Sequence, residues 1–281
     1  MKKLSFSAAA ICLTILTLTG AKAQSASTIT LWNFEPLTSG INNSPAPSTG
    51  SGTATSLGMD IYATPNVGVN GADVTLGKAN DTGSSGVTNT TLTWRVRGVA
   101  GTNGAANGWS SAAPIGTQGA QFNVATTGFS SINVSFDWYV TSAGAANLQF
   151  QYSTNGSSWI NTALALNGSA NGLVSTNNSS STNTVNGYYV RGLVGQNWFT
   201  GLTATISDEN AANNANFGFR LVNASTGVDC VSATNGALGN SGNWRFDNVT
   251  VSGTAVPEPA AYALLGLGAL VLILAGRRKH A

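Results

Sequence analysis

Charged side chains are scarce in this sequence. Lys, Arg, Asp and Glu make up 8% of its 281 residues, against about 25% in an ordinary soluble domain. The strong helix formers among the charged residues are therefore few, which disfavours a helical cytosolic protein. Residues 24–256 contain six bases and nine acids, a net charge of −3. Because this leaves no basic stripe, the composition excludes the electrostatic footprint of a nucleic-acid binder.

Cysteine and histidine are nearly absent, and this excludes several chemistries. The chain has two cysteines, Cys12 and Cys230, and one histidine, His280. With Cys12 in an N-terminal leader, Cys230 has no partner for an intramolecular disulfide, and we interpret it as a small buried hydrophobe. Without a histidine in the body, Ser-His-Asp and Cys-His catalysis are excluded, and no Cys or His cluster is available for zinc. We expect neither a metal nor a cofactor.

The N-terminus has the organisation of a secretory signal peptide, which covers residues 1–23. It has a positive start, an apolar stretch and a small-x-small cleavage site, at Lys2 and Lys3, residues 4–18, and Ala21-Lys22-Ala23. We predict that signal peptidase cuts after Ala23, so that Gln24 begins the exported protein. The alternative is an N-terminal membrane anchor, which the short apolar stretch disfavours.

The C-terminus has the organisation of a single membrane anchor. Residues 260–276 contain no charge and would form a helix of about 25 Å, at the short end of the range that spans a bilayer. Arg277, Arg278 and Lys279 follow directly and would stay on the cytoplasmic side at residues 277–281. The prediction is a transmembrane helix with the body outside the inner membrane. The alternative, a buried core helix, is disfavoured by this basic end.

The tail as a whole resembles the PEP-CTERM sorting signal of Gram-negative bacteria. The residues that show the resemblance are Val256-Pro257-Glu258-Pro259, the short apolar helix and then Arg277-Arg278. The resemblance implies recognition by exosortase, a transpeptidase-like membrane protease, cleavage near Pro-Glu-Pro, and release to the cell surface or the extracellular polymer matrix. The two prolines keep the junction extended and open to a protease. The resemblance is confined to residues 256–281, so it implies a destination and not an activity.

Between the two ends, apolar and polar residues alternate with a period of two, as in half-buried strands. In residues 132–140 the apolar side chains share one face and Asn133, Ser135 and Asp137 share the other. Asn155-Gly156 predicts a hairpin turn after residues 148–152. Further strands are expected at Ile29–Phe34, Leu92–Val99, Gln121–Ala125, Tyr188–Val194, Leu202–Ile206, Phe217–Val222 and Trp244–Val251.

The last of these strands changes phase. Trp244 and Phe246 have one parity, whereas Val249 and Val251 have the other. A β-bulge near Asp247-Asn248 would return all four side chains to one face. No segment of the body has the pattern of a three-turn amphipathic helix. The sequence therefore predicts an all-β fold, an antiparallel β-sandwich of jelly-roll type, with residues 24–255 as its one domain.

Tryptophans and carboxylates are the candidate functional side chains of the body. Trp109 stands in a long Gly- and Asn-rich loop, and Trp198 begins a strand after a turn. Both are flanked by amides, and an exposed indole in such a place can stack on a sugar ring. The alternative is that both fold back and cap the core. Glycoside hydrolysis needs only two carboxylates, and Asp137 and Asp247 are candidates for catalysis or for calcium ligation. We interpret Asp208-Glu209 as a solvated turn.

Together these patterns favour a non-enzymatic exported protein of the surface or matrix that is structural, adhesive or glycan-contacting. Its expected partners are signal peptidase, the inner membrane as a transient anchor, an exosortase and a polysaccharide, with no nucleic acid. The alternative function is a secreted polysaccharide-active enzyme with paired carboxylates. The exposure of Trp109 and the positions of the carboxylates distinguish the two.

Overall fold

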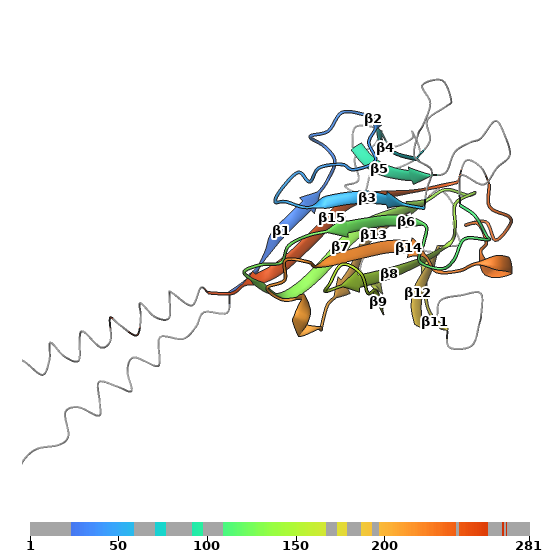
Figure 1. Ribbon diagram of the computed structural model, residues 1–281. Helices are drawn as coiled ribbons and strands as arrows, with labels where there is room; N and C mark the ends of the chain where they lie inside the picture. Colours follow the sequence, from blue (N-terminus) through green and yellow to red (C-terminus); the bar gives the residue numbers. More distant parts are fainter. Residues whose placement is uncertain are drawn as a thin grey trace, which may run out of the picture.

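Two antiparallel β-sheets form the body of the protein (Figure 1). A computed structural model describes residues 24–58, 71–76, 92–97, 109–166, 173–178, 187–192, 197–239 and 242–257, together with Gly266 and Gly268. Within residues 24–257, the described helical segments are two 3-10 turns, Glu209–Ala211 and Gly227–Asp229. The predicted all-β fold with two antiparallel sheets is therefore confirmed.

The first sheet, sheet A, has β15 and β7 at its centre, with the order β10-β13-β7-β15-β5-β4-β2 and with β1 also paired to β15. Its strands are β1 (Ala26–Trp32), β2 (Gly40–Ile41), β4 (Gly71–Leu76), β5 (Leu92–Arg97), β7 (Phe129–Val140), β10 (Ala165–Leu166), β13 (Asn197–Thr205) and β15 (Asn243–Ala255). The two central strands are also the longest that the structure describes. They position most of the candidate residues discussed below.

The second sheet, sheet B, has the order β11-β12-β8-β14-β6-β3, with β9 also paired to β8. Its strands are β3 (Thr53–Leu57), β6 (Gly119–Asn123), β8 (Asn147–Ser153), β9 (Ile160–Thr162), β11 (Leu173–Asn178), β12 (Gly187–Gly192) and β14 (Gly218–Asn223). The predicted hairpin is present, since β8 and β9 pair antiparallel across a turn in which Gly156 has a positive φ of 74°. Glycine adopts this conformation without a steric cost.

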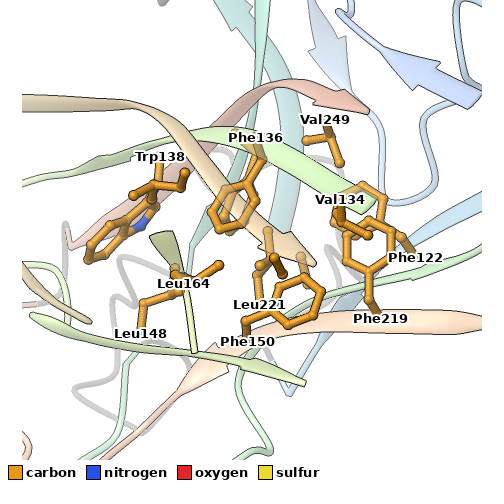
Figure 2. Packing of buried hydrophobic residues seen from close by; sticks show 14 of the residues in the cluster. Phe122, Val134, Phe136, Trp138, Leu148, Phe150, Leu164, Phe219, Leu221 and Val249 are labelled. Carbon is orange, nitrogen blue, oxygen red and sulfur yellow. The ribbon is translucent and has the colours of Figure 1, made fainter. Parts of the chain in front are cut away.

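Aromatic side chains from both sheets fill the space between them. Figure 2 shows Phe136 and Trp138 of β7 on one side and Phe150 and Phe219 of sheet B on the other. Phe136 and Phe150 stack with ring centroids 6.5 Å apart, and Trp94 of β5 meets Phe122 of β6 edge-on at 5.8 Å. Each side chain of this size contributes roughly 2–3 kcal/mol when it is fully buried. The chain therefore closes its sandwich by apolar packing, as the lack of disulfides requires.

The predicted bulge is present in β15. Asp247 pairs with Asp137 of β7, but the next paired residue, Thr250, lies opposite Ser135, so β15 contains one extra residue here. Asn248 has a positive φ of 48°, a conformation that asparagine adopts more readily than most residues. As a result Trp244, Phe246, Val249 and Val251 are all fully buried. The bulge thus joins the two phases of the strand into one inward face.

Both predicted membrane-directed segments lie outside the described residues. These are the leader at residues 1–23 and the apolar segment 260–276, of which only Gly266 and Gly268 are described, both exposed. Among the residues that the structure describes, no helix is both long and apolar enough to cross a membrane. The transmembrane helix at residues 260–276 stays a prediction.

Candidate functional site: the sorting junction and the outer faces of the sheets

The sorting junction begins where the folded body ends. Ala255, the last residue of β15, pairs with Phe129, and the Val256 N–H donates to the Gly128 carbonyl at 2.7 Å. Val256 is already 45% exposed, and Pro257 after it is exposed as well. Proline has no N–H to donate and therefore cannot extend the strand ladder. The first two residues of the predicted processing motif thus stand at the surface, next to the last backbone hydrogen bond of the sheet.

Other residues of the two predicted processing sites lie outside the described part of the chain. They are Ala21 and Ala23 at the signal cleavage site, and Glu258, Pro259, Arg277 and Arg278 in the tail. Gln24 is described and exposed. Because Ala26 of β1 pairs with Thr254 of β15, Gln24 lies at the same end of sheet A as the sorting junction. Gln24 and Pro257, the first and last residues of the described body, therefore lie at one end of the sandwich.

Trp109 does not have the exposure that sugar stacking requires. It is 6% exposed, and its ring centroid lies 4.1 Å from that of Trp244 in the core. Its Nε1 is buried with no hydrogen-bond partner. The glycan-stacking prediction for Trp109 is corrected to a core role, because its indole packs against Trp244 and is withdrawn from solvent. This is the alternative that the sequence left open.

Trp198 is buried on the opposite side of sheet A. It is 6% exposed, and its ring lies 5.3 Å from that of Tyr139 on the neighbouring strand β7. A cross-strand aromatic pair of this kind stabilises a sheet. Its Nε1 is also buried without a partner. The glycan-stacking prediction for Trp198 is corrected in the same way, since no open ring face is left for a sugar.

The outer face of sheet A brings two candidate carboxylates together. Asp137 and Asp247 lie directly opposite each other on β7 and β15. Asp137 was expected on the polar face of its strand, and there it is only 6% exposed, while Asp247 is 2% exposed. Their carboxylates are therefore neighbours that are both withdrawn from solvent.

Hydrogen bonds explain how these carboxylates are accommodated. Asp137 Oδ1 accepts from the Gly201 N–H at 2.7 Å, and its Oδ2 accepts from Asn248 Nδ2 at 2.9 Å. Gly201 and Asn248 both have positive φ and stand at bulges of the two strands that flank β7. The Asn248 N–H donates to Asp247 Oδ1 at 2.7 Å. One carboxylate of the central strand thus holds the bulges on both of its neighbours.

A buried arginine completes this polar cluster. Arg245 is 1% exposed. It pairs with Tyr139, two residues along both strands from the pair of Asp247 and Asp137, and its guanidinium lies 5.0 Å from the Tyr139 ring. A buried charge costs free energy unless nearby groups of opposite charge or hydrogen bonds compensate for it. We name Asp137, Asp247, Arg245, Tyr139 and Trp198 the closed cluster. Within it, both oxygens of Asp137 and Oδ1 of Asp247 accept hydrogen bonds from the same sheet.

The outer face of sheet B is different, because it is polar and accessible. Five residues from five adjacent strands lie in one row across it, in the order Thr55, Gln121, Arg220, Gln151 and Asn161. All five are exposed or partly exposed. At about 4.8 Å between strands, the row is roughly 19 Å wide. Apart from Arg220, these side chains are uncharged.

Trp159 lies on this same face and was not singled out from the sequence. It is partly exposed, and the Arg220 guanidinium lies 3.7 Å from its ring centroid. A Cβ on Gly218 would lie 3.6 Å from Trp159 Cη2, so the glycine lets the indole lie close to the sheet. The register of the hairpin indicates this position. Ile160 pairs with Tyr152, whose side chain is in the core. Trp159, the residue before Ile160, has the opposite parity and therefore belongs to the outer face.

The remaining candidates have structural contacts. Asp208 caps the first 3-10 turn by accepting from the Asn210 N–H, and the Tyr152 hydroxyl donates to Asp208 Oδ2 at 3.4 Å. Burial and the neighbouring Asp208 charge raise the pKa of Tyr152. Cys230 is buried as a free thiol, and burial raises its pKa. In the part of the chain that the structure describes, no group of three or more His, Cys, Asp or Glu could hold a metal ion.

Comparison with known protein families identifies the C-terminal tail. Residues 255–279 match the family described as the PEP-CTERM protein-sorting motif. The predicted resemblance at residues 256–281 is confirmed. This motif implies an exported protein that is sorted at the membrane by an exosortase, a membrane protease. Comparison of the whole chain with curated proteins gives no match.

Proposed function

We propose that this protein is a non-enzymatic component of the cell surface or extracellular matrix of a Gram-negative bacterium. The sequence supports a precursor in which signal peptidase removes residues 1–23 and residues 260–276 hold the body outside the inner membrane. The observation that carries the proposal is the position of the sorting motif. It begins at the residue where β15 ends, so an exosortase can reach Pro257 without unfolding the sheet.

The strand order supports a jelly-roll arrangement of residues 24–255. Sheet A contains β5-β15-β7-β13 and sheet B contains β6-β14-β8-β12, each as consecutive neighbours. The chain therefore changes sheet at β5 to β6, β6 to β7, β7 to β8, and again at each step from β12 to β15. Two interleaved sheets of this kind are what the jelly-roll interpretation requires. Such a body closes both sheets over one core and leaves two outer faces for contact.

The geometry of the junction also supports a defined orientation at the membrane. β7 begins at Phe129 beside the sorting junction and ends at Val140, roughly 37 Å away along the strand. A precursor anchored at residues 260–276 would therefore hold the Phe129 end near the membrane. The loop at residues 141–146 would point away from it. In this orientation the end of the body that points away from the membrane can make contacts before the precursor is cleaved.

A second function, glycoside hydrolysis, is favoured by one observation, the register pairing of Asp137 with Asp247. The reaction needs two carboxyl groups on either side of a bound glycosidic bond. Here both carboxylates are buried and accept hydrogen bonds from the bulges of their own sheet. These contacts support a structural role for the pair, and we therefore propose that the body is not an enzyme.

The sorting step is tested by replacing Pro257, Glu258 and Pro259 with alanine in the full chain. A membrane anchor needs only the apolar helix and the basic end, so insertion should be unchanged. An exosortase would lose the fixed backbone of two prolines and the carboxylate between them. We expect full-length protein to accumulate in the inner membrane, and wild-type surface protein to lack residues 260–281 in mass spectra.

A matched control separates anchoring from processing. Deletion of residues 260–281 removes the predicted span and should give a soluble exported protein that never pellets with inner membranes. If the triple alanine variant is released like the wild type, or if surface protein retains residues 260–281, then the tail is an ordinary anchor and the sorting proposal is wrong.

A further inference from the structure

Trp159 is the exposed indole that neither Trp109 nor Trp198 supplies. It precedes β9 and lies over sheet B, where the Arg220 guanidinium stacks 3.7 Å from its ring centroid. An indole offers a broad apolar surface, the kind of surface on which the C–H face of a sugar ring can lie. A partly exposed indole fixed against a sheet therefore meets the first requirement of a glycan site.

Amide side chains lie on the same face of sheet B as this indole. Gln121 Oε1 accepts from Arg220 Nε at 2.8 Å, and Gln121 Nε2 donates to Asn123 Oδ1 at 3.0 Å. Gln151 Nε2 donates to Asn161 Oδ1 at 2.9 Å. These bonds orient the amides, and each carboxamide has two N–H donors and an oxygen with two lone pairs. The face thus offers oriented donors and acceptors beside a ring, which is how hydroxyl groups are recognised.

We infer that Trp159, Arg220, Gln121, Asn123, Gln151 and Asn161, here named the amide platform, form a binding surface for a neutral polysaccharide. The inference rests on the proposed function, since it assigns the glycan contact of the exported body to one face. The platform is polar without acidic groups among its described residues, and its one cation is engaged with Trp159 and Gln121. A neutral, hydroxyl-rich chain matches this surface better than a polyanion, which would require several unengaged cations.

The arrangement of strands suits an extended ligand. Five platform residues come from β6, β14, β8 and β9, which lie side by side in sheet B (Figure 1), and Trp159 directly precedes β9. Arg220 lies opposite Gln121 and Gln151, Gln151 lies opposite Asn161, and Asn123 is two residues from Gln121 on the same face of β6. The polymer would therefore cross the strands, with one sugar on Trp159 and its neighbours over the amides.

The test is affinity electrophoresis of the exported protein in gels containing hydroxyethylcellulose, galactomannan, dextran or alginate. We expect retardation in at least one neutral polymer. We expect Trp159→Ala to weaken this binding at least about tenfold, in line with other aromatic hot spots. Gln151→Ala should weaken it to a smaller extent, and Trp159→Tyr should retain part of it because it restores a ring. Thermal melting should show that each variant is folded.

Two controls keep the outcomes distinct. Ile160→Ala changes the exposed neighbour of Trp159 that has the opposite parity, and Val228→Ala changes an exposed apolar residue far along the chain. Both should bind as the wild type does. If wild-type protein is retarded and Trp159→Ala is retarded equally, the platform is wrong while glycan contact stands. If no neutral polymer retards the wild type, or if only alginate does and salt abolishes it, the neutral-glycan inference fails, whereas the sorting proposal is judged by the motif variant alone.

Discussion

The two outer faces of this sandwich have the same alternation of side chains but opposite environments. On sheet A, Asp137, Arg245 and Asp247 are charged and buried. On sheet B, Gln121, Gln151 and their neighbours are nearly neutral and accessible. The charged residues therefore lie where a ligand has least access, and the uncharged amides lie where it has most. Residue chemistry and access must both be known before a face is assigned a function.

Hydrogen bonding explains why the charged face is the closed one. A buried carboxylate needs donors, and the bulges at Gly201 and Asn248 supply them to Asp137. The amides of sheet B need no such compensation, because water or a ligand hydroxyl can satisfy them. The closed cluster thus stabilises the fold, whereas the amide platform lies at the surface, where a ligand can reach it. Substitutions on the two faces should separate these roles.

The largest effect is expected for Asp137→Ala in the closed cluster. It removes two charge-assisted hydrogen bonds and leaves the Gly201 N–H without its acceptor, so the free energy of unfolding should fall by about 3 kcal/mol or more. Gln151→Ala on the open face should change it by less than about 0.5 kcal/mol. Urea denaturation of both variants measures the difference. Equal values would mean that the two faces do not differ energetically.

A smaller effect is expected at Asn248, where backbone and side chain can be separated. In Asn248→Gly the new residue tolerates the positive φ, but the hydrogen bond to Asp137 is lost, so the free energy of unfolding should fall by about 1 kcal/mol. Asn248→Ala loses the same bond and also strains the backbone, which should lower the free energy of unfolding by about 1 kcal/mol more. The difference between the two variants in denaturant midpoint measures the strain. If alanine proves no worse than glycine, the left-handed conformation is not needed for the bulge.

A still smaller effect is expected for Arg220→Ala on the amide platform. The variant removes a guanidinium stacked on Trp159, a contact worth roughly 0.5 kcal/mol at a partly exposed site. Stability should change little, while Trp159 should become more accessible to acrylamide quenching of its fluorescence. Arg220→Lys keeps the charge but not the planar stack and should behave like the alanine variant. Wild-type quenching in both variants would show that the stack does not hold the indole.

The smallest effect is expected from Tyr152, which lies between the core and the surface. Its pKa in the folded protein is raised by burial and by the Asp208 charge, so the folded state holds the phenolic proton more tightly than the unfolded state does. The resulting stabilisation is fully present below the ordinary value of about 10 and is lost as the pH rises through the raised pKa. Wild-type stability should therefore fall more steeply in alkali than that of Tyr152→Phe. Parallel pH profiles would contradict this assignment.

Sequence patterns predicted local features of the fold well. Alternation placed strands at residues 132–140 and 244–251, which lie within β7 and β15, and required the bulge that the structure shows at Asp247-Asn248. The sequence left Trp109 and Trp198 open between sugar stacking and capping the core, because a tryptophan near a turn looks alike in sequence whether it faces solvent or a core. Alternation also placed Asp137 on the polar face of its strand, but it states which side a residue faces and not what covers that side.

The sequence by itself predicted the leader and determined the sorting tail, the β class and the inward side chains of the central strands. These follow from order along the chain, from composition and from a period of two, which are local properties. Only the tertiary structure decided which outer face is buried, which indole reaches solvent and which carboxylates meet. These depend on strand order and on register between residues more than 100 positions apart, as in the pair Asp137 and Asp247. Packing sets the accessibility of a side chain, and accessibility decides whether a polar residue stabilises the fold or contacts a ligand.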